Sequence, residues 1–103
     1  MARQAAAKMK KAAYKRALHV VGSVVREWDP YSLIAGGAPP DEFDSEIAGV
    51  VAQIPRIKTK KEAVLALSRV FSSAFEAERF TPENCAEAGE KLFAALSENG
   101  FVG

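Results

Sequence analysis

The stretch YKRALHVVGSVVREWDP, residues 14–30, decides the fold. Its large apolar residues recur at alternating spacings of four and three, at Tyr14, Leu18, Val21, Val25 and Trp28. These spacings place one apolar stripe on a helix. The helix ends at the Asp-Pro pair, because the proline ring clashes with an α-helical conformation of the residue before it. We therefore predict a first helix over residues 4–27, with the stripe on its buried face.

The segment that follows this helix is predicted to be a loop. Residues 30–40 contain two glycines and three prolines and have no regular hydrophobic period, which is typical of a loop. A connection of this length is longer than most links between helices and often carries function. A second helix is predicted over residues 41–54, because carboxylates gather in its first turn. Asp41 is expected to cap this helix, and Pro55 ends it.

Two further helices have recognisable start signals. Thr59 and Glu62 have the spacing of a capping box, in which the Thr hydroxyl and the Glu carboxylate each accept a hydrogen bond from an end amide. They predict a third helix over residues 60–78. Thr81 followed by Pro82 marks the start of a fourth, because proline at the first helical position loses no helical hydrogen bond. Gly100 is expected to stop this helix in a left-handed conformation.

The apolar residues of these three helices also recur at spacings of three and four. They are Phe43, Ile47, Val50 and Ile54 in the second helix, Ala63, Leu67, Val70, Phe71, Ala74 and Phe75 in the third, and Cys85, Ala88, Leu92, Ala95 and Leu96 in the fourth. No alternating run of β-branched residues competes with these patterns. We predict an all-α protein, a single domain built as an irregular four-helix bundle.

The composition agrees with one soluble globular domain. The chain has 103 residues, of which 49% are hydrophobic and 26% are charged, and this length suffices for one core. The apolar runs are too short for a membrane span, so no membrane partner is expected. The single cysteine, Cys85, makes no internal disulfide, which favours a reducing, cytoplasmic setting. No cofactor motif is present, and none is expected.

The net charge of +1 conceals a strong asymmetry. Residues 1–26 carry seven basic residues and no acidic one, whereas residues 27–103 carry an excess of six carboxylates. We interpret residues 1–13 as a basic N-terminal extension of the first helix and residues 14–103 as the helical domain. The extension is either a solvated helix end or a weak attractant for nucleic acid, through a stripe of Arg3, Lys8, Lys11 and Lys15.

The densest candidate site combines aromatic and acidic residues around the predicted loop: Trp28, Asp29, Tyr31, Asp41, Glu42, Asp44 and Glu46. Such a surface suits a protein partner with a basic surface, so a non-enzymatic protein-interaction module is the leading hypothesis. Structural roles compete, since acidic residues favour a helix start and Trp28 can anchor the core with its indole N–H bonded to a loop carbonyl. A metal-dependent enzyme using Asp29 with Glu42 or Asp44 is the third hypothesis.

Nucleophilic catalysis has few candidate residues. His19 and Cys85 supply the only histidine and the only cysteine, and they come from different predicted helices. Cys85 lies on an apolar stripe, where a buried thiol is normally inert. His19 flanks the first helix beside basic residues, which favours a partly exposed structural role. We therefore do not expect an enzyme.

Several short motifs of the sequence resemble those of a known protein family. They are Trp28-Asp29-Pro30, Leu33, Asp41-Glu42-Phe43-Asp44-x-Glu46-Ile47, the Phe71 to Phe75 spacing and the Cys-x-x-Ala word at Cys85. Over about residues 14–96 the chain resembles an uncharacterised family of small bacterial helical proteins, a domain of unknown function with W-D-P and D-E-[YF]-D-x-E-I motifs. Phe43 stands where that family usually has tyrosine. The resemblance implies a helical fold without catalytic residues, and some relatives are similar to immunity proteins found beside bacterial toxins.

Overall fold

Four α-helices form within residues 10–102, the part of the chain that the computed structural model describes. They are α2 (Lys11–Trp28), α3 (Asp44–Gln53), α4 (Lys60–Ala74) and α5 (Ala86–Glu98). Three short 3-10 turns join them: η1 (Pro30–Ser32), η2 (Ile54–Arg56) and η3 (Ala77–Arg79). The described residues contain no strand. The predicted all-α helical bundle is therefore confirmed.

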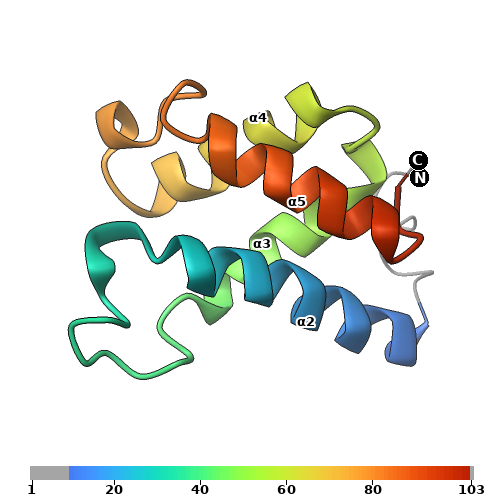
Figure 1. Cartoon of the computed structure of the whole chain (residues 1–103), viewed down its shortest axis with the longest axis horizontal. Helices are drawn as coiled ribbons and strands as arrows, with labels where there is room; N and C mark the ends of the chain where they lie inside the picture. Colours follow the sequence, from blue (N-terminus) through green and yellow to red (C-terminus); the bar gives the residue numbers. More distant parts are fainter. Residues whose placement is uncertain (1–9, 103) are drawn as a thin grey trace.

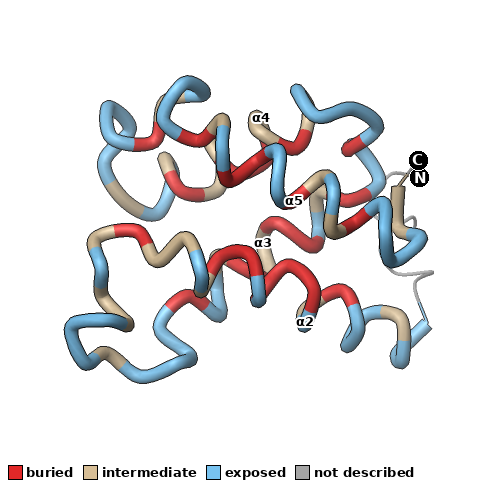
Figure 2. Tube along the Cα trace, viewed as in Figure 1, coloured by how far each residue is buried: buried red, intermediate tan, exposed pale blue. Residues whose placement is uncertain are grey.

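The helices enclose one core. Each of α3 and α5 packs against both α2 and α4, and successive helices run in alternating directions, with α3 crossing obliquely (Figure 1). The buried stretches of the helices face one another in the middle of the bundle (Figure 2). The arrangement brings the loop after α2 and the segment between α4 and α5 to the same end of the molecule (Figure 1).

Helix α2 follows its prediction at the C-terminal end. Asp29 is left-handed, with φ 46° and ψ 64°, and its N–H donates to the Val25 carbonyl, which agrees with the restriction that Pro30 imposes. The predicted start at residue 4 and most of the 1–13 extension lie outside the described residues. Tyr14 was wrongly assigned to the buried stripe, because it is 40% exposed. It lies one turn before Ala17, the first buried residue of the helix.

Helix α3 begins later than predicted. Its first residue is Asp44, and Asp41 does not cap it, because the N-cap position is occupied by Phe43 without a side-chain cap bond. The chain instead forms tight turns before the helix, in which the Glu42 N–H donates to the Pro39 carbonyl and the Asp44 N–H to the Asp41 carbonyl. A backbone carbonyl of Asp41 thus accepts the bond that its side chain was expected to accept.

The capping box of α4 is confirmed in a shifted form. The Glu62 N–H donates to Thr59 Oγ1 at 3.2 Å, as predicted. Glu62 Oε1, however, accepts from the Lys58 N–H at 2.8 Å and from the Thr59 hydroxyl at 3.4 Å instead of from the Thr59 N–H. The helix ends at Ala74, four residues before the predicted end. The hydroxyls of Ser68 and Ser72 donate to the Phe80 carbonyl. These bonds hold the returning chain against α4, so the helix does not continue.

Helix α5 begins at Ala86, after a turn over residues 82–85. Thr81 caps that turn and not the helix itself, through a bond from the Asn84 N–H to Thr81 Oγ1. The predicted stop is confirmed, because Gly100 has φ 78°. Gly100 donates to the Ser97 carbonyl and Phe101 to the Leu96 carbonyl, which is the Schellman arrangement.

Helices α4 and α5 approach closely at Gly89. A Cβ atom built on Gly89 would lie 2.7 Å from the Val64 Cα and 2.9 Å from the Val64 nitrogen. These are backbone atoms, which cannot move aside as the end of a side chain can. Glycine is therefore needed here for packing, although its φ is not left-handed.

The cap at the start of α4 and the core packing of the same helix give a first prediction. Thr59→Ala removes one cap bond and should lower the free energy of unfolding by about 1 kcal/mol. Leu67→Ala opens a cavity at a fully buried position and should lower it by about 2–5 kcal/mol. Urea unfolding followed by circular dichroism measures both values. A harmless Leu67→Ala variant would contradict the observed core.

The contact at Gly89 gives a second prediction. Gly89→Ala should lower the free energy of unfolding by about 1–3 kcal/mol, because the helices must separate to admit the methyl group. Gly22→Ala is the matched control. The new Cβ at position 22 meets only the flexible end of the Arg26 side chain, and alanine favours a helix by about 1 kcal/mol. Thermal melting should rank Gly89→Ala well below Gly22→Ala; equal melting temperatures would refute the close approach.

Candidate functional site

Tyr31 joins the two segments at the loop end of the bundle. Its ring centroid lies 5.6 Å from that of Phe75 and 5.8 Å from that of Phe80. Its hydroxyl donates to Glu76 Oε1 at 2.6 Å, and the Arg79 guanidinium lies 4.4 Å above the ring. These contacts combine aromatic packing, a charge-assisted hydrogen bond and a cation–π interaction. The loop after α2 is therefore held against η3.

The Asp29 side chain holds the same loop through hydrogen bonds to its backbone. Its two carboxylate oxygens accept hydrogen bonds from the Ile34 N–H at 2.9 Å and the Ala35 N–H at 3.0 Å. Asp29, Tyr31 and Ser32 all have positive φ, between 46° and 64°, a conformation that costs about 1–3 kcal/mol for each non-glycine residue. Both oxygens of this predicted binding residue are thus engaged in holding a strained turn.

Trp28 is half-buried and serves as the predicted core anchor. Its ring packs edge-on against Phe71 and Phe80, with centroid distances of 5.0 and 5.8 Å. The predicted bond from the indole N–H to a loop carbonyl is wrong, because the hydrogen bonds of the described residues include none from this group. The loop amides of Ile34 and Ala35 instead donate to Asp29, and Trp28 is partly exposed.

The partly exposed Trp28 lines a groove. Two hollows, of about 250 and 390 Å³, share Trp28 and Asn84 in their walls. One lies between α2 and α5 and is also lined by Glu27, Glu87 and Lys91. The other is lined by Tyr31, Arg79 and Phe80. We call the two hollows together the Trp28 groove.

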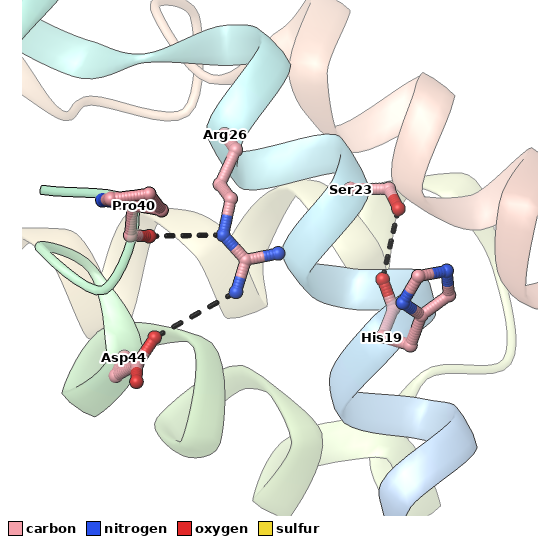
Figure 3. Close-up of polar contacts among 5 residues, drawn as sticks. All are labelled: His19, Ser23, Arg26, Pro40 and Asp44. Atoms are coloured by element: carbon pink, nitrogen blue, oxygen red, sulfur yellow. Dashed lines mark hydrogen bonds and ion pairs between the residues drawn. The ribbon is translucent and has the colours of Figure 1, made fainter. Parts of the chain in front are cut away.

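Asp44 lies on the other flank of α2. Arg26 Nε donates to the Pro40 carbonyl at 3.1 Å, and Arg26 Nη2 lies 3.7 Å from Asp44 Oδ1 (Figure 3). Residues two apart on a helix point in nearly opposite directions, so Arg26 and Trp28 serve different faces. The structure therefore brings Trp28 and Tyr31 together and separates both from Asp44.

The remaining predicted acidic residues stay outside the groove walls. Asp41 and Glu42 are exposed and Glu46 is half-exposed, and none of their side chains takes part in a hydrogen bond or ion pair within residues 10–102. No group of three His, Cys, Asp or Glu side chains in this part of the chain is placed to hold a metal ion. The carboxylates that the metal-dependent hypothesis would use thus do not form such a group among these residues.

Cys85 and His19 do not form a catalytic pair. Cys85 is fully buried, and burial raises the pKa of its thiol from 9.0 to about 11, so it stays protonated and poorly nucleophilic at neutral pH. His19 is exposed on α2, where its backbone carbonyl accepts a hydrogen bond from the Ser23 hydroxyl (Figure 3). The inert thiol expected from the sequence agrees with this burial.

The basic stripe of the first helix is described only in part. Lys11 and Lys15 are exposed on α2, whereas Arg3 and Lys8 lie outside the described residues. Arg16 has a structural role that the sequence did not indicate. It donates to the Asn99 carbonyl at 2.9 Å and lies 4.6 Å above the Phe101 ring, and so ties α2 to the end of α5.

Sequence reasoning missed the α5 side of the groove. Asn84 and Glu87 reach Trp28 from more than fifty positions away along the chain. Their local pattern contains no motif, and only their place beside the apolar stripe of α5 sets them at the edge of a buried face. The Asn84 side chain also donates to the Arg79 carbonyl at 3.0 Å, which steadies the wall between the two hollows.

Comparison with known proteins adds no relative. No protein-family model matches the chain, and no curated protein or solved structure matches it significantly. The family resemblance that rests on the W-D-P and D-E-F-D motifs therefore stays a prediction. None of the described helices combines the length and apolarity that a membrane-spanning helix needs.

The Tyr31 contact gives a third prediction, on pH dependence. The hydrogen bond to Glu76 raises the pKa of Tyr31 above 10.0, so folding favours the neutral phenol. Its contribution to stability is complete below about pH 10 and is lost as the pH rises through the higher folded pKa. The difference in unfolding free energy between the wild type and Tyr31→Phe should be constant from about pH 7 to pH 9 and shrink at higher pH. Urea titrations at each pH test this, and a constant difference up to pH 11 would contradict it.

Proposed function

We propose that this protein is a non-enzymatic interaction module whose Trp28 groove binds a basic segment of a partner protein. The observation that carries the proposal is that the partly exposed Trp28 lines the same hollow as the exposed residues Glu27 and Glu87. An aromatic face beside negative charge is the surface that attracts guanidinium and ammonium groups. The ion pair between Glu87 and Lys91, at 3.8 Å, is exposed and so weak that a partner's cation can replace it.

The charge of the surrounding surface supports the same partner. Exposed carboxylates of the described residues dominate the loop end of the bundle: Glu27, Asp41, Glu42, Glu76, Glu78, Glu83 and Glu87. The segments with the most lysines and arginines, the start of α2 and residues 56–61, lie at the opposite end (Figure 1). The molecule is 36 Å long, several times the distance over which salt screens charge. The acidic end therefore attracts a basic partner without interference from the basic end.

The mechanism has two stages. The acidic end steers the partner and raises the association rate, an effect that falls with ionic strength. A lysine or arginine then lies against Trp28, where the ring contact holds it and slows dissociation. An immunity-type protein that covers the basic surface of a nuclease toxin would act in this way. The proposal includes a reducing, cytoplasmic setting, because the single cysteine is a buried thiol.

The test uses Trp28 as its own reporter, since it is the single tryptophan. A hexa-arginine peptide should change the Trp28 fluorescence in a saturable way at low salt. Glu27→Gln combined with Glu87→Gln should weaken the peptide about fivefold, as expected for two exposed ion pairs. Asp41→Asn with Glu42→Gln removes equal charge beyond the groove walls and should have the smaller effect.

The matched control leaves the groove intact. Glu90→Gln combined with Glu98→Gln removes the same charge from exposed positions of α5 that do not line the groove. Its affinity should fall less than that of the groove variant, because neither side chain lines the groove. An unchanged Trp28 emission, or equal losses in the groove and control variants, would refute the proposed site.

A further inference from the structure

A separate hollow of about 480 Å³ lies between the end of α3, η2 and α4. It shares no residue with the Trp28 groove. Ile57, Leu65 and Ala66 contribute apolar walls, and Ile57 is buried. Apolar walls exclude water and strengthen any electrostatic contact made beside them. The hollow is large enough for a small molecule.

The remaining walls of the hollow are strongly cationic. Arg56, Lys58 and Arg69 line it, and none of the three takes part in an ion pair within residues 10–102. One carboxylate, that of Glu62, also lines the hollow, but its Oε1 already accepts from the Lys58 N–H at 2.8 Å. The walls thus carry an excess of two positive charges, and the two guanidinium groups have the planar fork that fits a phosphate.

Gln53 adds a polar group that the fold leaves unsatisfied. Its Oε1 atom is buried and has no hydrogen-bond partner among the described residues. Gln53 is the last residue of α3 and lines the hollow. A buried acceptor without a partner destabilises the fold, so such groups are rare in native proteins and concentrate where a ligand or function uses them. A ligand hydroxyl in the hollow would satisfy this oxygen once the Gln53 side chain turns its carboxamide toward the hollow.

We propose that this hollow binds a small phosphomonoester that carries a hydroxyl group. Arg56, Lys58 and Arg69 hold the phosphate, and the Gln53 carboxamide accepts a hydrogen bond from the hydroxyl. A nucleic-acid backbone would need the cations but neither the apolar part of the walls nor Gln53. The site is independent of the Trp28 groove, so either proposal stands without the other.

The experiment is an NMR titration with glycerol phosphate and with inorganic phosphate, at constant ionic strength. Glycerol phosphate should shift the side-chain amide of Gln53 in a saturable way and bind more tightly than inorganic phosphate, because it adds the hydroxyl contact. Arg56→Gln and Arg69→Gln should each weaken both ligands about tenfold, as expected for a charge-assisted bond. Lys61→Gln is the matched control, since Lys61 is exposed on α4 and does not line the hollow; its affinities should stay within about twofold.

Gln53→Met separates the hydroxyl contact from charge. This variant should bind glycerol phosphate no more tightly than inorganic phosphate while keeping the phosphate affinity. It should also melt at the wild-type temperature or above, because it removes an unsatisfied buried oxygen. The proposal is overturned if Gln53 does not shift, if Arg69→Gln is no weaker than Lys61→Gln, or if a single-stranded oligonucleotide binds more tightly than glycerol phosphate with the same dependence on Arg56 and Arg69.

Discussion

The packing around Phe71 is the interaction on which the loop end of the bundle depends. Phe71 is fully buried in α4, and its ring centroid lies within 6.1 Å of those of Trp28, Phe43, Phe75 and Phe80. These partners come from the end of α2, the start of α3, the end of α4 and the segment after η3. One side chain therefore contacts four segments that are separated along the chain. Trp28 packs edge-on against Phe71 and Phe80 and stays partly exposed.

The direction of the helices determines how charge is distributed. The chain alternates direction along the bundle (Figure 1), so the starts of α2 and α4 share an end with the last turn of α5. Lysines and arginines precede or begin α2 and α4, whereas carboxylates follow α2 and surround the start of α5. A charge asymmetry that is divided between several stretches of sequence thus becomes a single asymmetry in space. Neither the acidic end nor the basic end of the bundle takes its charge from a single motif.

Local sequence signals predicted the helices well. They failed where a contact between residues far apart in the sequence determines a helix end or the position of a side chain. The cap at Thr59 and the left-handed Gly100 depend on residues within a few positions, and both are confirmed. The end of α4 depends on Phe80 folding back onto Ser68 and Ser72. For the site, the sequence identified Trp28 and Tyr31 but grouped them with Asp44, which Arg26 holds on the other flank of α2. Neighbours along the chain separate when a helix turns, and no local pattern indicates Asn84.

Departures from favourable local structure occur beside the two proposed sites. Three left-handed residues without glycine, Asp29, Tyr31 and Ser32, adjoin the Trp28 groove, and the unsatisfied oxygen of Gln53 lines the cationic hollow. Elsewhere several features of the described chain favour stability: a capped α4, a Schellman stop after α5 and an apolar core, although α2, α3 and α5 have no side-chain cap. A sequence with such stabilising features keeps a costly one where another requirement competes with stability. The costs at these two positions are therefore physical arguments for binding that do not depend on the charges of either surface.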